Sequence, residues 1–185
     1  MKQLVVLVGL PGSGKTAYQR EHPDWVILSR STIRQAMFRC SYDPAVEETV
    51  DRIFHAALVE ALDSPSEVVC IDEPNLTCCE RASLIELARL SGRRAVACVL
   101  TDVSPDAAYA RMQRGLKRLA LETPHLRVHA FPRTAFDALV DLHEPIAESE
   151  GFDAIEQIAA RAPAAGAIGT ARARVEREPL PLFSS

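Results

Sequence analysis

The residues best suited to chemistry in this 185-residue chain form a glycine-rich run near its start. The run follows an apolar stretch, residues 4–8, and fits the pattern G-x-x-x-x-G-K-[ST]. Glycines let successive backbone N–H groups point inward at an anion, and the helix that follows adds its positive end. Such a loop binds the polyphosphate of a nucleoside triphosphate. The predicted nucleotide-binding residues are Gly9, Pro11, Gly12, Ser13, Gly14, Lys15 and Thr16, together with Arg111 further along the chain.

Two side chains of this run have distinct expected roles. Lys15 would reach the β- and γ-phosphates, and the Thr16 hydroxyl would hold Mg²⁺. Asp72 directly follows another apolar stretch, residues 68–71, which is where an acidic residue orients Mg²⁺ or its water shell. We therefore predict that ATP and Mg²⁺ bind here, with Thr16 and Asp72 at the metal.

Strand-like and helix-like stretches alternate along the chain, which is typical of a parallel sheet covered on both faces. We predict a P-loop NTPase-type α/β fold with three layers, α/β/α, and a mainly parallel sheet of four or five strands. The predicted strands are 4–8, 25–28, 68–71 and 95–100, with a further short element near 152–158. The predicted helices run from 15 to about 22, 33–40, 46–62, 77–91, 104–118 and 133–142.

One domain is expected over residues 1–160, because this length supports a sizeable core. A helical lid is predicted within it at about 111–133. Residues 161–185 are rich in Ala, Gly, Pro and Arg, which predicts a flexible or loosely docked tail.

Two basic clusters are expected near the ligand, which in open α/β sheets lies beyond the carboxyl ends of the strands. Residues 29–41 hold three arginines and no acid, and residues 111–133 hold six Arg or Lys against one acid. The three arginines are Arg30, Arg34 and Arg39. Arg111 and Arg114 are three residues apart on one predicted helical face, so both could point at a transferring phosphoryl group.

The net charge, the length of the apolar runs and the cysteine spacing exclude several classes of protein. A net charge of −4 argues against extensive wrapping of nucleic acid. No apolar run approaches the roughly 20 residues that span a bilayer, and no signal-peptide layout is present, so we predict a cytoplasmic protein without membrane partners. The five cysteines show neither a disulfide framework nor zinc spacing. The adjacent pair Cys78–Cys79 is either redox-active or two small helix residues.

These features together resemble the P-loop kinases of the polynucleotide kinase type, over roughly residues 3–158. The matching motifs are Gly9–Thr16, Ile33-Arg34-Gln35, Ile71-Asp72 with Asn75-Leu76-Thr77, Glu80-Arg81, Arg111 with Arg114, and Glu150–Asp153. The resemblance implies ATP-dependent transfer of the γ-phosphate to a hydroxyl, most specifically a polynucleotide 5′-hydroxyl. It also implies that Arg34 contacts an acceptor-side phosphate, Asp72 orders the site and Arg114 stabilises the γ-phosphate.

The chain departs from this family at Ser31, where the family carries an Asp that accepts the proton of the acceptor hydroxyl. A serine without a partner is no base near neutral pH. Base catalysis is worth ~10²–10⁴-fold, although phosphoryl transfer depends more on positioning and electrostatics. Ser31 is therefore either a modified catalytic position or only a helix N-cap. If the base is lost, Ser31→Asp should raise activity.

Other interpretations stay open. Asp72-Glu73 also fits the acidic pair of P-loop ATPases, in which the Glu polarises a water, so Glu73 is an alternative base. A small-molecule or nucleotide kinase of the same fold is a second possibility. A third is an ATP-binding or ATP-hydrolysing regulatory module whose kinase activity has lapsed. The residues do not specify the acceptor, ATP against GTP, or the oligomeric state.

Overall fold

The computed structural model describes residues 1–100 and 102–159, and the tail expected at 161–185 lies outside them. Its five strands form one sheet in the order β2-β3-β1-β4-β5, and every neighbouring pair is parallel. The strands are β1 Gln3–Val8, β2 Val26–Leu28, β3 Val68–Ile71, β4 Arg94–Val99 and β5 Ala154–Gln157. The predicted parallel α/β sheet is confirmed.

Six α-helices lie in the described part of the chain. They are α1 Lys15–Gln19, α2 Arg30–Ile33, α3 Glu47–Asp63, α4 Cys78–Leu90, α5 Pro105–Glu122 and α6 Arg133–Asp141. A short π-helix, η1 Arg34–Phe38, continues α2, and a 3₁₀ turn, η2 Glu148–Glu150, precedes β5. None of these helices is long and apolar enough to cross a membrane.

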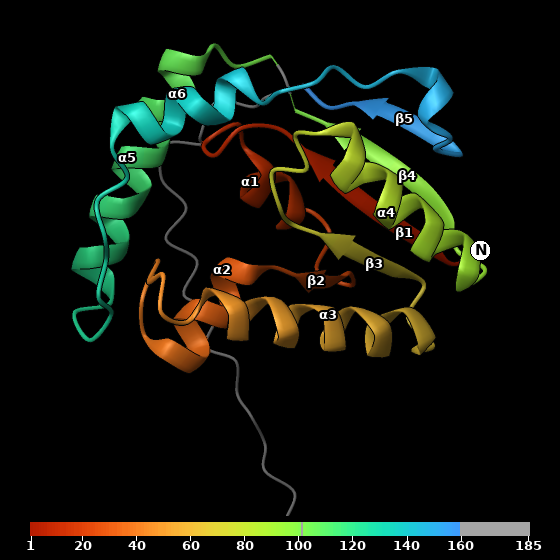
Figure 1. Cartoon of the computed structure of the whole chain (residues 1–185), viewed down its shortest axis with the longest axis horizontal. Coiled ribbons are helices and arrows are strands. Elements are labelled where there is room, and N and C mark those ends of the chain that lie inside the picture. The colour runs from red at the N-terminus through yellow and green to blue at the C-terminus, as the bar shows by residue number, and fades with distance from the viewer. Residues whose placement is uncertain (101, 160–185) are drawn as a thin grey trace, which may run out of the picture.

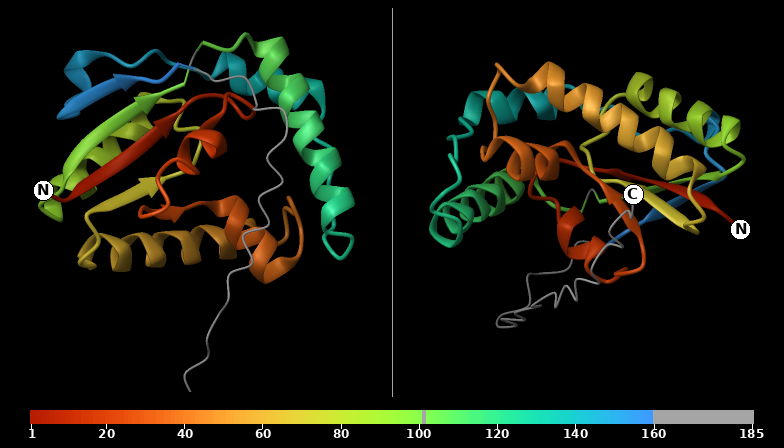
Figure 2. Two further views of the ribbon diagram at one scale, coloured as in Figure 1. Left: turned by 180° about the vertical axis from the view of Figure 1, so that it is seen from behind. Right: turned by 90° about the horizontal axis from the view of Figure 1, so that it is seen from below.

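Helices cover the sheet unequally. The long helix α3 and helix α4 pack on one face through the apolar positions that their helical periodicity aligns (Figure 1). The short helix α1 lies on the opposite face, which Figure 2 shows from behind. There, Tyr18 and Trp25 pack against Val5, Leu7 and the buried cysteines of the inner strands. Helices α5 and α6 sit at one end of the molecule rather than on either face (Figure 1).

Two predicted helix starts agree with the structure. Thr77 and Glu80 form a reciprocal capping box at α4, in which each side chain accepts the other residue's backbone N–H. Ser104 caps α5 through the N–H of Ala107, and Pro105 occupies the first turn. Cys78 and Cys79, the adjacent pair, are therefore exposed residues of the first turn of α4.

The prediction of a helix over residues 33–40 is wrong about where the helix starts and about its type. It begins at Arg30, so Ser31 lies inside α2 and is not its N-cap. Ser29 occupies the cap position but its side chain caps nothing among the described residues. Instead the Glu73 carboxylate, just beyond the carboxyl end of the neighbouring strand β3, accepts the Arg30 N–H at 2.6 Å. It thereby provides an acceptor for one of the backbone N–H groups that the first turn of α2 leaves without an intrahelical partner.

A buried ion pair joins helix α4 to the 3₁₀ turn η2 that precedes β5. Arg81 of α4 is fully buried and donates to both carboxylate oxygens of Glu150, at 2.7 and 2.8 Å. The same guanidinium donates to the carbonyls of Asn75 and Leu76, at 3.1 and 2.9 Å. Arg81 therefore fixes the segment that follows β3 against the segment that leads into β5.

Replacing Arg81 by alanine should lower the free energy of unfolding by about 3–5 kcal/mol, since it leaves the Glu150 carboxylate and two carbonyls without their donor. Urea unfolding followed by circular dichroism measures the change. The control is Arg89→Ala on the same helix, whose exposed guanidinium donates, among the described residues, to the Gly151 carbonyl alone. That control should cost about 0.5 kcal/mol. Equal losses for both variants would contradict the structural role given to Arg81.

Candidate active site

The glycine-rich run forms a loop between β1 and α1 that only glycine accommodates at three positions. Gly9, Gly12 and Gly14 have φ angles of 152°, 87° and 116°. A Cβ on Gly12 would lie 2.1 Å from the Ala108 carbonyl oxygen of α5. The backbone of α5 therefore touches the loop directly, and the positive φ angles let the loop curl ahead of α1.

The Lys15 ammonium hydrogen-bonds to backbone carbonyls of this loop. Lys15 is 9% exposed and donates to the carbonyls of Gly9 at 2.6 Å and Leu10 at 3.0 Å. Burial lowers the pKa of Lys15 from 10.5 to about 8, while the carboxylates of Asp72 and Glu73 act in the opposite direction. Lys15 is thus a desolvated cation beside two acids, at the position expected to meet the phosphates.

The segment that follows β3 is hydrogen-bonded to the end of β1 and to the start of the loop. The Gly9 N–H donates to the Pro74 carbonyl at 3.1 Å, and the Asn75 side-chain amide donates to the Leu7 carbonyl at 2.7 Å. Asn75 holds a φ of 48°, in the left-handed region that Asn tolerates better than most residues. These bonds set Asp72, the predicted metal residue, beside the loop.

The donor set at this point fits a hard cation with a polyphosphate. The Thr16 hydroxyl and the Asp72 carboxylate are oxygen ligands, which Mg²⁺ prefers, and Mg²⁺ usually takes only one or two carboxylates beside phosphate oxygens. Ser13 Oγ is buried and has no hydrogen-bond partner among the described residues. A bound anion would supply this hydroxyl with an acceptor.

The first basic cluster is largely neutralised within the chain. Arg34 forms two bonds to Glu47 of α3, at 2.7 and 2.5 Å, and this pair raises the pKa of Arg34. Arg30 bonds to Asp51 of α3 at 2.5 Å. No acid lies close to these arginines in the sequence, but α3 brings carboxylates to them in the fold. The sequence pattern therefore did not predict that their charge is neutralised.

The second basic cluster is only partly neutralised, because Arg127 pairs with Asp43 and Arg133 pairs with Asp106 and Asp137. Arg111 is partly buried and Arg114 is exposed, and neither forms an ion pair within residues 1–100 and 102–159. Arg111 precedes Met112, whose backbone nitrogen lies 3.0 Å from the position of a Cβ on Gly12. The arginines of α5 thus lie on the helix that contacts the loop.

The segment after α5 is tied to the segment after η1. The Arg127 N–H donates to the Arg39 carbonyl at 2.9 Å, and the Ser41 N–H donates to the Arg127 carbonyl at 3.0 Å. The His129 N–H donates to Ser41 Oγ at 2.8 Å. The predicted lid is therefore anchored at both ends, on the loop by α5 and on the neighbourhood of α2 by this bridge.

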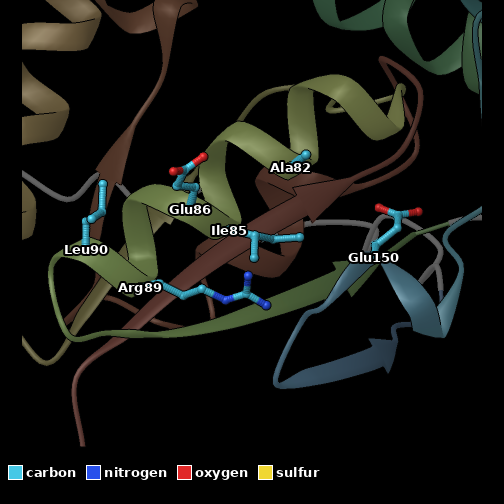
Figure 3. A pocket seen from close by; sticks show the side chains of 6 residues that line it. All are labelled: Ala82, Ile85, Glu86, Arg89, Leu90 and Glu150. Atoms are coloured by element: carbon cyan, nitrogen blue, oxygen red, sulfur yellow. The ribbon is translucent and has the colours of Figure 1, made fainter.

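One cavity borders the loop and another lies on α4. The first, of about 250 Å³, opens beside the loop and is lined by Gly14, Ala17, Tyr18, Leu100, Gln157 and Ile158. The other, of about 570 Å³, lies on α4 and is bordered by Ile85, Arg89 and Glu150 (Figure 3). The second contains none of the predicted site residues, whereas the first adjoins the site through Gly14.

A family model described as an AAA domain matches residues 4–130, which is more than half of the chain, so the chain belongs to this family. The matched range holds the loop, Asp72 and the arginines of α5. No curated protein sequence matches the chain.

Solved structures share the fold. Kti12 of Chaetomium thermophilum, in complex with ADP-AlF3, is similar at 20% identity and a TM-score of 0.55, covering 84% of this chain and 88% of that one. A protein of Chloroflexus aurantiacus that has been proposed to be a kinase gives 13% identity, a TM-score of 0.62 and coverage of 85% and 88%. A chain of the Pnkp1/Rnl/Hen1 complex gives 24% identity and a TM-score of 0.51, with coverage of 60% and 38%. The chain therefore has the P-loop kinase and NTPase fold.

A methyl group at position 12 should disrupt the loop. Gly12→Ala should destabilise the protein by at least about 1 kcal/mol, because φ is positive and the Cβ meets the backbone of α5. It should also weaken Mg·ATP binding, measured by equilibrium dialysis. The control Gly115→Ala lies on α5 with nothing described within 4 Å of its Cβ, and should be stabilising by about 0.5–1 kcal/mol. Tight nucleotide binding by Gly12→Ala would refute this view of the loop.

The lowered pKa of Lys15 predicts a pH dependence of nucleotide affinity. Polyphosphate favours the charged lysine, which the free protein loses as pH rises through about 8. The dissociation constant for Mg·ATP should therefore rise by up to about tenfold between about pH 8 and pH 9, with proton uptake on binding. Calorimetry in buffers of different ionisation enthalpy measures this uptake. Lys2→Met should show the same uptake as the parent, and constant affinity without uptake would contradict the prediction.

Proposed function

We propose that this protein is an ATP-dependent phosphotransferase that moves the γ-phosphate to a hydroxyl acceptor. The observation that carries the proposal is the convergence on one loop of a buried lysine, two carboxylates and an arginine-bearing helix. Phosphoryl transfer is catalysed mainly by positioning and by stabilising charge on the phosphoryl oxygens. These residues are the types which that chemistry requires.

Each residue has a role in this proposal. The amides of residues 9–16 and the Lys15 ammonium bind the β- and γ-phosphates. Thr16 and Asp72 would hold Mg²⁺, which when bound neutralises charge on the phosphate oxygens. Arg111 and Arg114 would stabilise charge on the transferring group from the lid side. The cavity of about 250 Å³ beside Gly14 supports a place for the nucleobase.

The acceptor we favour is a nucleic-acid 5′-hydroxyl. Lys117 and Arg118 continue the basic stretch of α5 beyond Arg114, and no described residue forms an ion pair with them. An exposed row of cations on the lid suits the phosphodiesters of a strand whose end enters the site.

A small-molecule or nucleotide acceptor is the second candidate. Its support is the pairing of Arg30 and Arg34 with acids of α3, which leaves less free positive charge on the acceptor side. A panel of acceptors separates the two. Incubation with γ-labelled ATP should place label on a 5′-hydroxyl oligonucleotide, whereas label only on a small hydroxyl compound would support the second candidate. Release of free phosphate alone would support an ATP-hydrolysing module instead.

Removing the lysine charge should abolish transfer. Lys15→Ala should show no label on any acceptor of the panel, since the phosphates lose the buried ammonium of the loop. Arg114→Ala should reduce kcat by at least about 10²-fold while leaving Mg·ATP affinity within a few-fold, because its role is on the transferring group. Steady-state kinetics with the labelled acceptor measure both. Undiminished transfer by Lys15→Ala would exclude the proposed site.

A further inference from the structure

We propose that the segment after η1 binds a single-stranded nucleic acid some nucleotides away from its reacting 5′ end, with Arg39 on a phosphodiester and the Tyr42 ring against a base. This inference rests on the function proposed above and specifies its acceptor as a strand of several nucleotides. Arg39 and Tyr42 follow the helical stretch that begins at Arg30, on the side of the site where the acceptor is expected.

The guanidinium of Arg39 differs from those of the other arginines of the first basic cluster. Arg30 and Arg34 pair with acids of α3, whereas the Arg39 side chain is exposed and no carboxylate in the described part of the chain pairs with it. The nearest acid in the sequence, Asp43, pairs with Arg127 instead, at 3.3 Å. Arg39 is therefore available for an anion, and its planar set of donors suits a phosphate group.

The backbone of Arg39 is fixed in a conformation that is uncommon for arginine. Its φ of 50° lies in the left-handed region. The Arg39 N–H donates to the Arg34 carbonyl, and the Arg39 carbonyl accepts the Arg127 N–H at 2.9 Å. The next residue, Cys40, is fully buried and pairs with Arg127 in an isolated parallel bridge. Backbone conformations of this kind, held by the surrounding structure, cluster at ligand-binding positions.

The ring of Tyr42 lies just beyond the same bridge and is 49% exposed. No other aromatic ring among the described residues packs against it. The preceding residue is anchored, because the Ser41 N–H donates to the Arg127 carbonyl at 3.0 Å and Ser41 Oγ accepts the His129 N–H at 2.8 Å. An exposed ring on an anchored backbone offers a face on which a base of any identity can stack.

The length of the helical stretch sets the distance between these side chains and the reacting end. Residues 30–38 form α2 and η1, and a rise of about 1.5 Å per residue makes this stretch roughly 13 Å long. Nucleotides of one strand are spaced by about 3.4 Å along a duplex, so the stretch corresponds to up to about four nucleotides. An acceptor with a single nucleotide would therefore not reach Arg39 and Tyr42.

The first test measures binding of a fluorescent single-stranded octanucleotide to the full-length protein by anisotropy at several salt concentrations. Arg39→Asn removes the charge and keeps a residue that tolerates the φ of 50°. It should weaken binding and reduce the slope of log K against log salt by about 0.7. Tyr42→Ala should raise Kd by about 5- to 150-fold without changing the slope, because it removes a stacking face and no charge.

The matched control for the charge is Arg20→Asn. Arg20 is an exposed arginine that follows α1, and no described residue forms an ion pair with it. This variant should bind the octanucleotide with the affinity and salt slope of the parent. Thermal unfolding of all three variants should resemble that of the parent, since each side chain is exposed.

The second test compares two acceptors in the transfer assay with γ-labelled ATP. Arg39→Asn and Tyr42→Ala should lower kcat/KM for a 5′-hydroxyl octanucleotide by the factor measured in binding. Both variants should leave kcat/KM for a nucleoside 3′-monophosphate within about twofold of the parent, because a single nucleotide does not extend to this segment.

Two results would overturn the inference. Parental affinity and salt slope in both variants would exclude this segment as a strand-binding surface while leaving the proposed transfer intact. Equal losses on the octanucleotide and the monophosphate would show that the variants disturb the reaction centre and not a distant contact. If the parent transferred phosphate to no acceptor, the proposed function would fail, and weaker octanucleotide binding by the variants would still support the surface.

Discussion

The site depends on one constraint, the attachment of the glycine-rich loop to the end of β3. The Gly9 N–H binds the Pro74 carbonyl, and the Asn75 amide reaches the Leu7 carbonyl across the two strands. Because β1 and β3 are adjacent and parallel, their carboxyl ends deliver the Lys15 ammonium and the acids at Asp72 and Glu73 to one place. The desolvated lysine is stabilised by those acids, so the arrangement holds its cation ready for an anion.

Local sequence patterns predicted most of the fold. Apolar runs marked the strands, and the helical periodicity of residues 46–62 marked the buried side of α3, since both signals need only neighbouring residues. The start of α2 escaped prediction because the group that caps it, Glu73, is 43 residues away. The partners of Arg34 escaped for the same reason, because Glu47 reaches it only after the chain has turned into α3. The roles predicted for individual site residues stay predictions.

Several motifs that suggested the family are explained by contacts that hold the elements of the fold together. Arg81 and Glu150, which lie in two separate motifs, form the buried ion pair that joins α4 to the approach of β5. Asp153 accepts the N–H of Ala95 and so places β5 beside β4. These residues stabilise the fold, whereas the chemistry is proposed to depend on the loop, Asp72 and the arginines of α5. Resemblance over residues 3–158 therefore combines a shared frame with a site that differs at position 31.

The central claim is that the amides of residues 9–16 and Lys15 bind a polyphosphate. Isothermal titration of Mg·ATP into the folded protein tests it most directly. We predict saturable binding at one site per chain that requires the triphosphate, so that Mg·ATP binds and adenosine alone does not. Failure of a well-folded protein to bind either Mg·ATP or Mg·GTP would contradict the claim.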